Sequence, residues 1–234
     1  MTAASMPTIP PAATGGNLRG TGASRAIPLM VKLVYSAFLV ILVPVYLVRY
    51  GPTNFLYFCD ISLFLALLSL WTRWPLPASM AAVGLLVPQA LWTADLLVRL
   101  AGFPLLGMTD YMFDDRSPLF LRLLSLFHVW LPILLLWMVG RLGYDPRAFR
   151  LWVCCGTILL LVSYFLLPAP PAPADDPGLP VNVNLVYGFS DKAPQTAMPP
   201  LAYLGLMVIA MPLLCYLPAH LLLRRLFLRN RHAG

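Results

Sequence analysis

Apolar residues dominate six long stretches of the chain, and short polar segments separate these stretches from one another. Each stretch has the length of about 18 residues or more that an apolar helix needs to cross the hydrocarbon core of a bilayer. The pattern predicts an all-α fold, a polytopic transmembrane helix bundle with about six spans. The predicted spans are residues 29–48, 54–71, 78–99, 119–139, 149–167 and 201–223.

The segments outside the spans divide into two tails and two long loops. Residues 1–28 are rich in Pro, Ala and Gly and predict a disordered cytoplasmic tail. Residues 100–118 and 168–200 predict outer loops, and residues 224–234 predict a basic cytoplasmic tail. The first span is too long for the core of a signal peptide and lacks a small-residue cleavage site after it, so we expect it to be retained.

Composition supports a membrane protein. Hydrophobic residues make up 60% of the 234 residues and charged residues 11%, and the mean hydropathy is +0.79. The four cysteines all lie in apolar stretches, which argues against a disulfide framework. The net charge of +7 comes from basic residues near the ends of spans, a pattern typical of anchoring at lipid headgroups. We therefore expect the lipid bilayer as a partner and no nucleic acid.

The distribution of charge predicts the orientation of the bundle. If the amino terminus is cytoplasmic, eleven of the sixteen Lys and Arg residues lie on the inner side. Six aspartates then lie in the outer loops, Asp145 alone lies inside, and Asp60 and Asp95 lie within spans. Both observations predict that the two termini are cytoplasmic.

Asp60 lies within the second predicted span. A carboxylate near the centre of a transmembrane helix costs about 2.5 to 3.5 kcal/mol, and each Leu or Phe returns only about 0.3 to 0.6 kcal/mol. The stretch is apolar enough to insert all the same, so Asp60 must face protein, water or a ligand. Asp60 is therefore a candidate functional residue, and a hydrogen bond to an Asn, Ser or Tyr of another helix is the structural alternative.

Other polar residues gather in the same outer half of the predicted bundle. At 1.5 Å per residue, Asp60 lies roughly 10 Å and His128 roughly 14 Å below the outer surface, with Asp95 about one turn below it. The inner half of the spans is nearly all Leu, Val, Ile and Trp. We expect an outward-facing polar cavity, and its candidate ligand-binding residues are Asn54, Asp60, Asp95, His128, Asn182, Asn184 and Tyr187.

Several of these residues also have a structural interpretation. Arg99 follows Asp95 at the spacing of a same-helix ion pair. His128 is either a neutral core histidine bonded across helices or, together with carboxylates, part of a proton relay. His220, four residues before Arg224, is expected at the membrane interface. No HExxH, HxxxH or repeated Asp spacing is present, so the sequence predicts no metal site and identifies no cofactor.

The second long loop contains alternating polar and apolar residues. If the segment is extended, Asn182 and Asn184 lie on one face and their apolar neighbours on the other. This alternation predicts a lid over the outer mouth of the bundle. Tyr187 and Gly188 then form a turn at its end.

Three stretches of the chain carry a resemblance to known sequences. They are NFLYFCD at residues 54–60, the segment 123–132 around His128, and NVNLVYG at residues 182–188. In these stretches the chain resembles a group of uncharacterised bacterial multi-pass inner-membrane proteins. The resemblance covers the region from the first span to the carboxyl terminus, and it implies a bacterial inner-membrane location and no established activity. No motif for ATP, a dinucleotide or a nucleophile elbow is present.

Three functions are compatible with this pattern. The leading hypothesis is an outward-facing site that binds or translocates a small molecule or ion, with Asp60 and His128 as the titrating pair. The second is a membrane enzyme that acts on a lipid-type substrate at the outer leaflet, with His128 as general base and Asp60 orienting it. The third is a non-catalytic subunit of a membrane complex. Because the inner half offers almost no polar residues, a binding or enzymatic site fits better than a path through the membrane.

Overall fold

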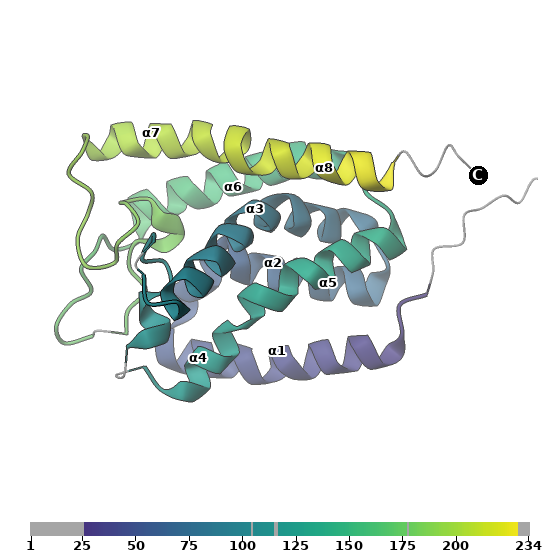
Figure 1. Ribbon diagram of the computed structural model, residues 1–234, viewed down its shortest axis with the longest axis horizontal. Helices are drawn as coiled ribbons and strands as arrows, with labels where there is room; N and C mark the ends of the chain where they lie inside the picture. The colour runs from purple at the N-terminus through teal and green to yellow at the C-terminus, as the bar shows by residue number, and fades with distance from the viewer. Residues whose placement is uncertain (1–25, 104, 115–116, 177, 229–234) are drawn as a thin grey trace, which may run out of the picture.

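The computed structural model describes residues 26–103, 105–114, 117–176 and 178–228, and the regular secondary structure of this part of the chain is all helical (Figure 1). The predicted all-α class is therefore confirmed. Most of the predicted amino-terminal tail lies outside the described residues, as do Asp115, Arg116 and the end of the basic tail from residue 229.

The described chain contains α-helices, three short 3₁₀ turns and one π-helical segment. The α-helices are α1 (Leu29–Tyr50), α2 (Phe58–Thr72), α3 (Pro75–Leu100), α4 (Leu119–Ser125), α5 (Phe127–Leu142), α6 (Arg147–Leu166), α7 (Pro200–Ala210) and α8 (Leu217–Phe227). The 3₁₀ turns are η1 (Pro52–Leu56), η2 (Asp110–Phe113) and η3 (Val183–Leu185), and the π-helical segment η4 (Met211–Tyr216) joins α7 to α8.

Five helical segments of the described chain are long and apolar enough to cross a membrane. They are Leu29–Tyr50, Pro75–Leu100, Leu119–Leu142, Arg147–Leu166 and Pro200–Phe227. The second predicted span, residues 54–71, instead gives the shorter apolar helix α2, which has 15 residues. Large apolar side chains such as Val48, which is 89% exposed, cover the outside of the bundle. Such a surface is stable when its solvent is lipid.

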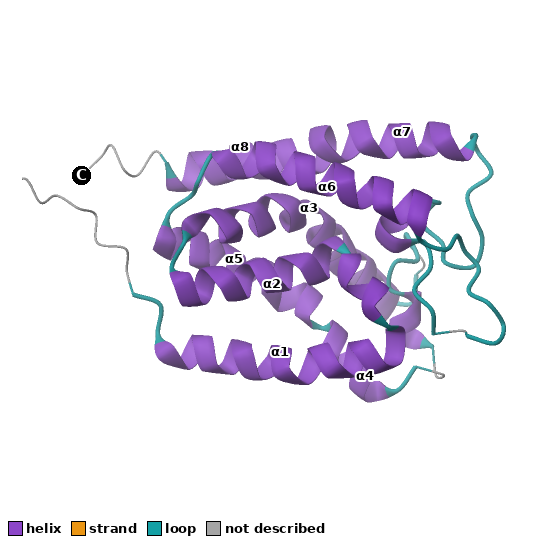
Figure 2. Ribbon diagram, turned by 180° about the vertical axis from the view of Figure 1, so that it is seen from behind, coloured by secondary structure: helices purple, strands orange, loops and turns teal. Residues whose placement is uncertain are grey.

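The helices form a bundle around α3, which packs against α2, α5, α6 and α8. α1 runs along one side of the bundle, and α7 and α8 run along the opposite side (Figures 1 and 2). The α1–α2, α3–α4 and α6–α7 connections lie together at one end, which we call the loop end. The α2–α3 and α5–α6 connections, and both ends of the described chain, lie at the opposite end, the turn end. The distribution of charge predicts that the turn end faces the cytoplasm.

Close packing in the centre of the bundle depends on Gly84 in α3. Trp152 of α6 is fully buried, and its indole ring lies directly on Gly84. A Cβ atom at position 84 would lie 2.0 Å from Trp152 Cε2, so no larger residue fits unless the ring moves. Gly84 therefore sets how closely α3 and α6 approach each other.

The fourth predicted span is divided at Leu126 into α4 and α5. The Val129 N–H donates to the Leu126 carbonyl at 3.0 Å, whereas an uninterrupted α-helix would use the Ser125 carbonyl. His128 Nδ1 lies 2.7 Å from that Ser125 carbonyl and satisfies it. Pro132 in α5 has no backbone N–H, so the His128 carbonyl also lacks its usual helical donor. The break therefore lies next to a candidate site residue.

The last span is also irregular. Within it, the Leu217 N–H donates to the carbonyl of Pro212, five residues earlier, which is the π-helical pattern. Pro212 and Pro218 both lack a backbone N–H, so the regular ladder is interrupted twice. The single helix predicted for residues 201–223 is thus two α-helices joined by a widened turn.

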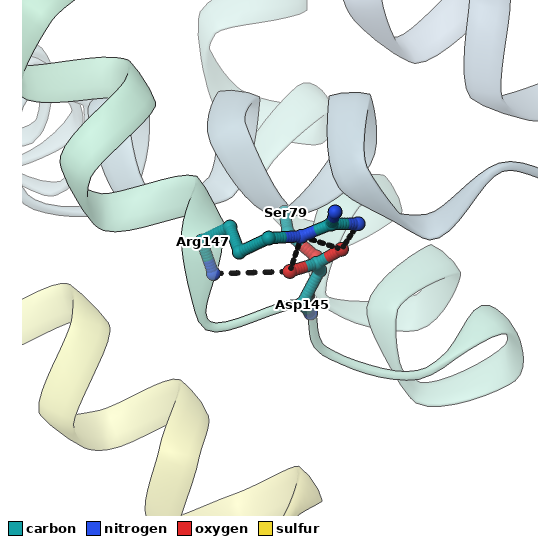
Figure 3. A network of polar contacts seen from close by, with 3 residues as sticks. All are labelled: Ser79, Asp145 and Arg147. Carbon is teal, nitrogen blue, oxygen red and sulfur yellow. Dashed lines mark hydrogen bonds and ion pairs between the residues drawn. The ribbon is translucent and has the colours of Figure 1, made fainter.

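Side chains close to the two short connections hold the turn end together. Asp145 accepts hydrogen bonds from the backbone N–H of Arg147 at 3.0 Å and from its guanidinium Nη2 at 2.7 Å (Figure 3). The Asp145 N–H donates to Ser79 Oγ of α3 at 3.0 Å. Hydrogen bonds from Arg147 hold the pKa of the Asp145 carboxyl below its usual value. In the α2–α3 connection, Ser69 Oγ donates to the Trp74 carbonyl at 2.7 Å.

One buried polar pair also lies at the turn end. The Tyr144 hydroxyl lies 2.5 Å from His220 Nδ1, and the two residues are 4% and 8% exposed. The His220 ring also packs against Phe149, with ring centroids 4.9 Å apart. His220 is therefore packed inside the protein at the turn end.

Candidate functional site

The candidate site lies at the amino terminus of the short helix α2. α2 and α3 meet at the turn end, but α2 has 15 residues and α3 has 26. At 1.5 Å per residue, α2 extends about 22 Å from the turn end and α3 about 39 Å. The amino terminus of α2 therefore lies within the bundle, below the loop end. Residues from η1 and from the α6–α7 connection occupy the space above it.

Asp60 lies in the first turn of α2 and is 2% exposed. Its Oδ2 accepts a hydrogen bond from Asn54 Nδ2 at 3.3 Å and lies 3.8 Å from the Cys59 thiol. Its Oδ1 is buried and has no hydrogen-bond partner in the described part of the chain. The hydroxyls of Tyr46 and Tyr57 lie within electrostatic range of the carboxyl group. Asp60 thus has an Asn partner, as one interpretation predicted, but this Asn comes from the adjacent turn η1 and not from another helix.

Asn184 anchors the α6–α7 connection to the amino terminus of α2. Its Oδ1 accepts the Phe58 N–H at 2.9 Å, which satisfies one of the backbone donors that the start of a helix leaves free. Its Nδ2 donates to the Leu56 carbonyl at 3.0 Å and to Ser163 Oγ of α6 at 3.1 Å. One side chain therefore joins η1, α2 and α6.

The segment around Asn182 and Asn184 is a compact buried loop, so the predicted extended lid is wrong. Residues 181–184 are buried, and both asparagines adopt left-handed backbone conformations, with φ of 52° and 60°. Asn tolerates this region better than most residues, which explains its use here. The alternating polar and apolar residues therefore form a 3₁₀ turn here and not a strand. We call residues 181–188 the asparagine loop.

Asn182 holds the asparagine loop in shape. Its Oδ1 accepts the Tyr187 N–H at 2.8 Å, and its Nδ2 donates to the Gly188 carbonyl at 2.8 Å. Tyr187 in turn donates its hydroxyl to the Tyr164 carbonyl of α6 at 2.8 Å, and the two tyrosine rings stack. Gly188 has φ 127°, as the predicted turn at this position requires. The hydrogen bonds of Asn182 and Tyr187 therefore stabilise the asparagine loop.

Asp95 organises the connection between α3 and α4. It is 1% exposed and accepts hydrogen bonds from the backbone N–H groups of Leu106 at 2.6 Å and Thr109 at 2.8 Å, and from the Thr109 hydroxyl at 2.8 Å. Arg99 lies 3.9 Å from Asp110 instead. The predicted Asp95–Arg99 ion pair is therefore wrong, because the Asp95 carboxylate accepts hydrogen bonds from backbone N–H groups of the folded loop.

His128 lies at the break between α4 and α5. Its Nδ1 lies 2.7 Å from the Ser125 carbonyl, and a carbonyl accepts only, so Nδ1 carries a proton. The ring stacks between Trp92 and Phe127, with centroids 4.6 Å and 4.1 Å away. The expected cross-helix hydrogen bond is replaced by this local one. Within the described residues no hydrogen bond joins Asp60 to His128, because the partners of Asp60 are Asn54 and Cys59.

Ser125 nevertheless connects the surroundings of His128 to those of Asp60. The Ser125 hydroxyl lies 3.2 Å from the hydroxyl of Tyr46, which is the tyrosine close to Asp60. Tyr111 of η2 also lies near this region, and burial of its hydroxyl raises its pKa. The two predicted titrating residues therefore belong to one polar region without direct contact.

Three residues of this region were not among the site residues predicted from the sequence. Tyr46 lies in the apolar span α1, Tyr57 donates to the Val181 carbonyl at 3.3 Å, and Ser163 bonds Asn184. Ser163 had a detectable signal, since it is one of few hydroxyl residues in the apolar helix α6. The two tyrosines resembled ordinary membrane-interface aromatics.

The arrangement suits a proton or a positively charged group better than a metal cluster. No group of three His, Cys, Asp or Glu side chains in the described residues is placed to hold a metal ion. The loop end contains one buried carboxylate with an oxygen that lacks a hydrogen-bond partner in the described residues, the Asn54 amide and several tyrosine hydroxyls. A carboxylate in such a place lowers its energy by taking up a proton or by pairing with a cation.

Comparison with protein-family models, curated proteins and solved structures finds no match to this chain. Its class therefore follows from the fold alone. The five span-length apolar helices and the shorter sixth one of the described chain, arranged around α3, fit an all-helical integral membrane protein.

Proposed function

We propose that this protein binds a small positively charged molecule or ion at its loop end, with Asp60 as the charged ligand group. The observation that supports this proposal is the Asp60 Oδ1 atom, which is buried without a hydrogen-bond partner in the described residues. Neighbouring polar groups such as Asn184 and Asp95 have partners for both side-chain atoms. Among the carboxylates in the described part of this end, Asp60 is the one with a buried oxygen that lacks a hydrogen-bond partner.

The location belongs to the same proposal. The resemblance to bacterial inner-membrane proteins implies a bacterial inner membrane, and the excess of basic residues near the turn end supports a cytoplasmic position for that end. The proposed site then lies at the end of the bundle that faces away from the cytoplasm. Deeper along the buried face of α2, Leu63, Ala66 and Leu70 are all 0% exposed, which supports binding rather than passage through the bundle.

The proposal is tested by thermal unfolding of the detergent-purified protein with a panel of probes, namely Na⁺, K⁺, Mg²⁺, Ca²⁺, choline and ethanolamine. A cation that binds only the folded state stabilises it by about 2.7 kcal/mol at one hundred times its Kd. We expect at least one probe to stabilise the wild type, and Asp60→Asn to abolish that effect. Without a probe, Asp60→Asn is expected to be as stable as the wild type or about 1 to 2 kcal/mol more stable, because it removes a buried carboxyl group whose Oδ1 lacks a hydrogen-bond partner.

Asp110→Asn is the matched control, because Asp110 is a carboxylate of the same end whose side chain is 49% exposed beside Arg99. This variant should keep the response to the active probe. If Asp60→Asn unfolds more easily than the wild type and no probe distinguishes the two, Asp60 has a structural role and the proposal fails.

A further inference from the structure

An open groove lies between α1 and α4 on the outside of the bundle, near the loop end. Its volume is about 750 Å³. Most of its lining is apolar, and one cation stands among the lining residues. They are Pro44, Val45, Val48 and Arg49 of α1, Pro118, and Phe120 and Leu121 of α4. Val48 and Phe120 are 89% and 53% exposed, so the groove opens toward the acyl chains of the surrounding lipid.

A second, smaller hollow of about 270 Å³ continues from the groove, and Val48 and Arg49 line both. Its other lining residues include Asp176 and Gly178 of the α6–α7 connection. A Cβ atom at Gly178 would lie 3.3 Å from the Arg49 carbonyl and 3.7 Å from Asp176 Oδ1. The connection thus lies directly against the end of α1, and a carboxylate stands near the Arg49 backbone.

Arg49 and Asp176 are both exposed, and neither forms an ion pair or side-chain hydrogen bond in the described residues. The order of groups along the two hollows is therefore an apolar groove, then a guanidinium, then a carboxylate. A guanidinium matches a phosphate, to which it donates paired hydrogen bonds. A carboxylate matches an ammonium group.

We infer that these two hollows bind one zwitterionic phospholipid of the phosphatidylethanolamine type. One acyl chain lies in the groove between α1 and α4, the phosphate pairs with Arg49, and the primary ammonium donates to Asp176. A lipid with an anionic headgroup meets repulsion from Asp176, and a choline headgroup has no N–H to donate. The site is separate from Asp60, and its test does not depend on the function proposed for that residue.

Retention of lipid by the purified protein tests this inference. The protein is exchanged into detergent micelles with equal amounts of phosphatidylethanolamine, phosphatidylglycerol and phosphatidylcholine, and the bound lipids are counted by native mass spectrometry. We expect phosphatidylethanolamine to be enriched over the other two. Arg49→Gln should retain it about tenfold less well, the effect of losing one charge-assisted pair. Asp176→Asn should still bind lipid but should lose the discrimination against phosphatidylglycerol.

Two matched controls separate the site from general effects. Arg150→Gln removes an exposed arginine of α6 at the turn end and should leave lipid retention unchanged. Val48→Trp fills the groove and should lower retention, whereas Ile133→Trp adds the same bulk at an exposed position of α5 and should not. Equal retention of the three lipids by the wild type would overturn the inference, as would equal retention by Val48→Trp and Ile133→Trp. A thermal unfolding curve for each variant establishes that it is folded.

Discussion

The two ends of this bundle are held together in different ways. At the turn end, the α2–α3 and α5–α6 connections are short, and some of their polar groups find partners a few residues away, as Ser69 does with Trp74 and Asp145 with Arg147. At the loop end, the contacts that cover the start of α2 join residues more than 120 positions apart, such as Asn184 with Phe58. The turn end thus combines contacts between near neighbours with two more distant partners, Ser79 and His220, whereas the start of α2 at the loop end is covered by a segment far along the chain.

This difference follows from the length of α2. A helix that begins inside a membrane bundle leaves backbone N–H groups that neither lipid nor the helix itself can satisfy. Another segment must enter the bundle to satisfy them, and the asparagine loop does so through Asn184. Irregular backbone at membrane depth is tolerated where protein buries it, and such places are where membrane proteins keep their polar sites. The loop end is therefore a place where the buried carboxyl group of Asp60 is tolerated.

The largest expected effect comes from Asn184→Ala, which removes the contact that closes the loop end. Three hydrogen bonds are lost, each worth about 1 kcal/mol, and alanine tolerates the left-handed conformation less well by about 1 kcal/mol. We expect the free energy of unfolding to fall by about 3 to 4 kcal/mol. Chemical unfolding in mixed micelles measures it.

Two further variants sharpen this result. Asn184→Gly loses the same hydrogen bonds but accepts the backbone conformation, so it should lose about 1 kcal/mol less than Asn184→Ala. Lys192→Ala alters an exposed position of the same connection and should change stability by less than about 0.5 kcal/mol. If Asn184→Ala behaves like Lys192→Ala, the asparagine loop does not hold the loop end together.

At the turn end, Tyr144→Phe is expected to have a smaller effect. It removes one hydrogen bond, to His220, and leaves a buried imidazole nitrogen without its partner. The expected loss is about 1 to 2 kcal/mol in the same unfolding measurement. Tyr164→Phe is the control, because the Tyr164 hydroxyl makes no hydrogen bond within the described residues, and it should cost less than about 0.5 kcal/mol. An equal loss in the two variants would mean that the Tyr144–His220 bond contributes nothing measurable.

The contrast between the ends also explains what could be predicted from sequence. Apolar length alone is enough to place the helices, because each span must satisfy its own backbone in lipid. Asp60, Asn182 and Asn184 were identified as candidates because polar residues are costly in such a chain. All three lie at the loop end.

The arrangement of these residues could not be predicted, because it depends on partners that are remote in sequence. Asp95 has Arg99 at ideal helical spacing, yet it accepts the backbone donors of a loop whose fold no local pattern encodes. The asparagines alternate with apolar residues as in a strand, yet each adopts a positive φ. The start of α2 at Phe58 is likewise fixed by Asn184, far along the chain.

The smallest expected effect concerns the pH dependence of the turn end. The pKa of Asp145 is lowered in the folded protein by its hydrogen bonds with Arg147, so its ionised form stabilises the fold above the ordinary carboxyl pKa near 4. That contribution is lost as the pH falls through the lowered value. Because Arg147 is 66% exposed and screened by water, we expect the loss between pH 6 and pH 3 to be a few tenths of a kcal/mol.

Unfolding of the wild type and Asp145→Asn at several pH values between 3 and 7 measures this contribution. Asparagine keeps the hydrogen bond with the Arg147 N–H but does not titrate, so the acid-dependent loss should shrink in this variant. It should shrink equally in Arg147→Gln, which removes the main cause of the lowered pKa. Asp145→Ala also removes the hydrogen bond that the Arg147 N–H donates at the start of α6 and should cost about 1 kcal/mol at every pH. If Asp145→Asn loses as much stability in acid as the wild type, other groups carry the acid sensitivity. The turn end would then owe its stability to uncharged local contacts alone.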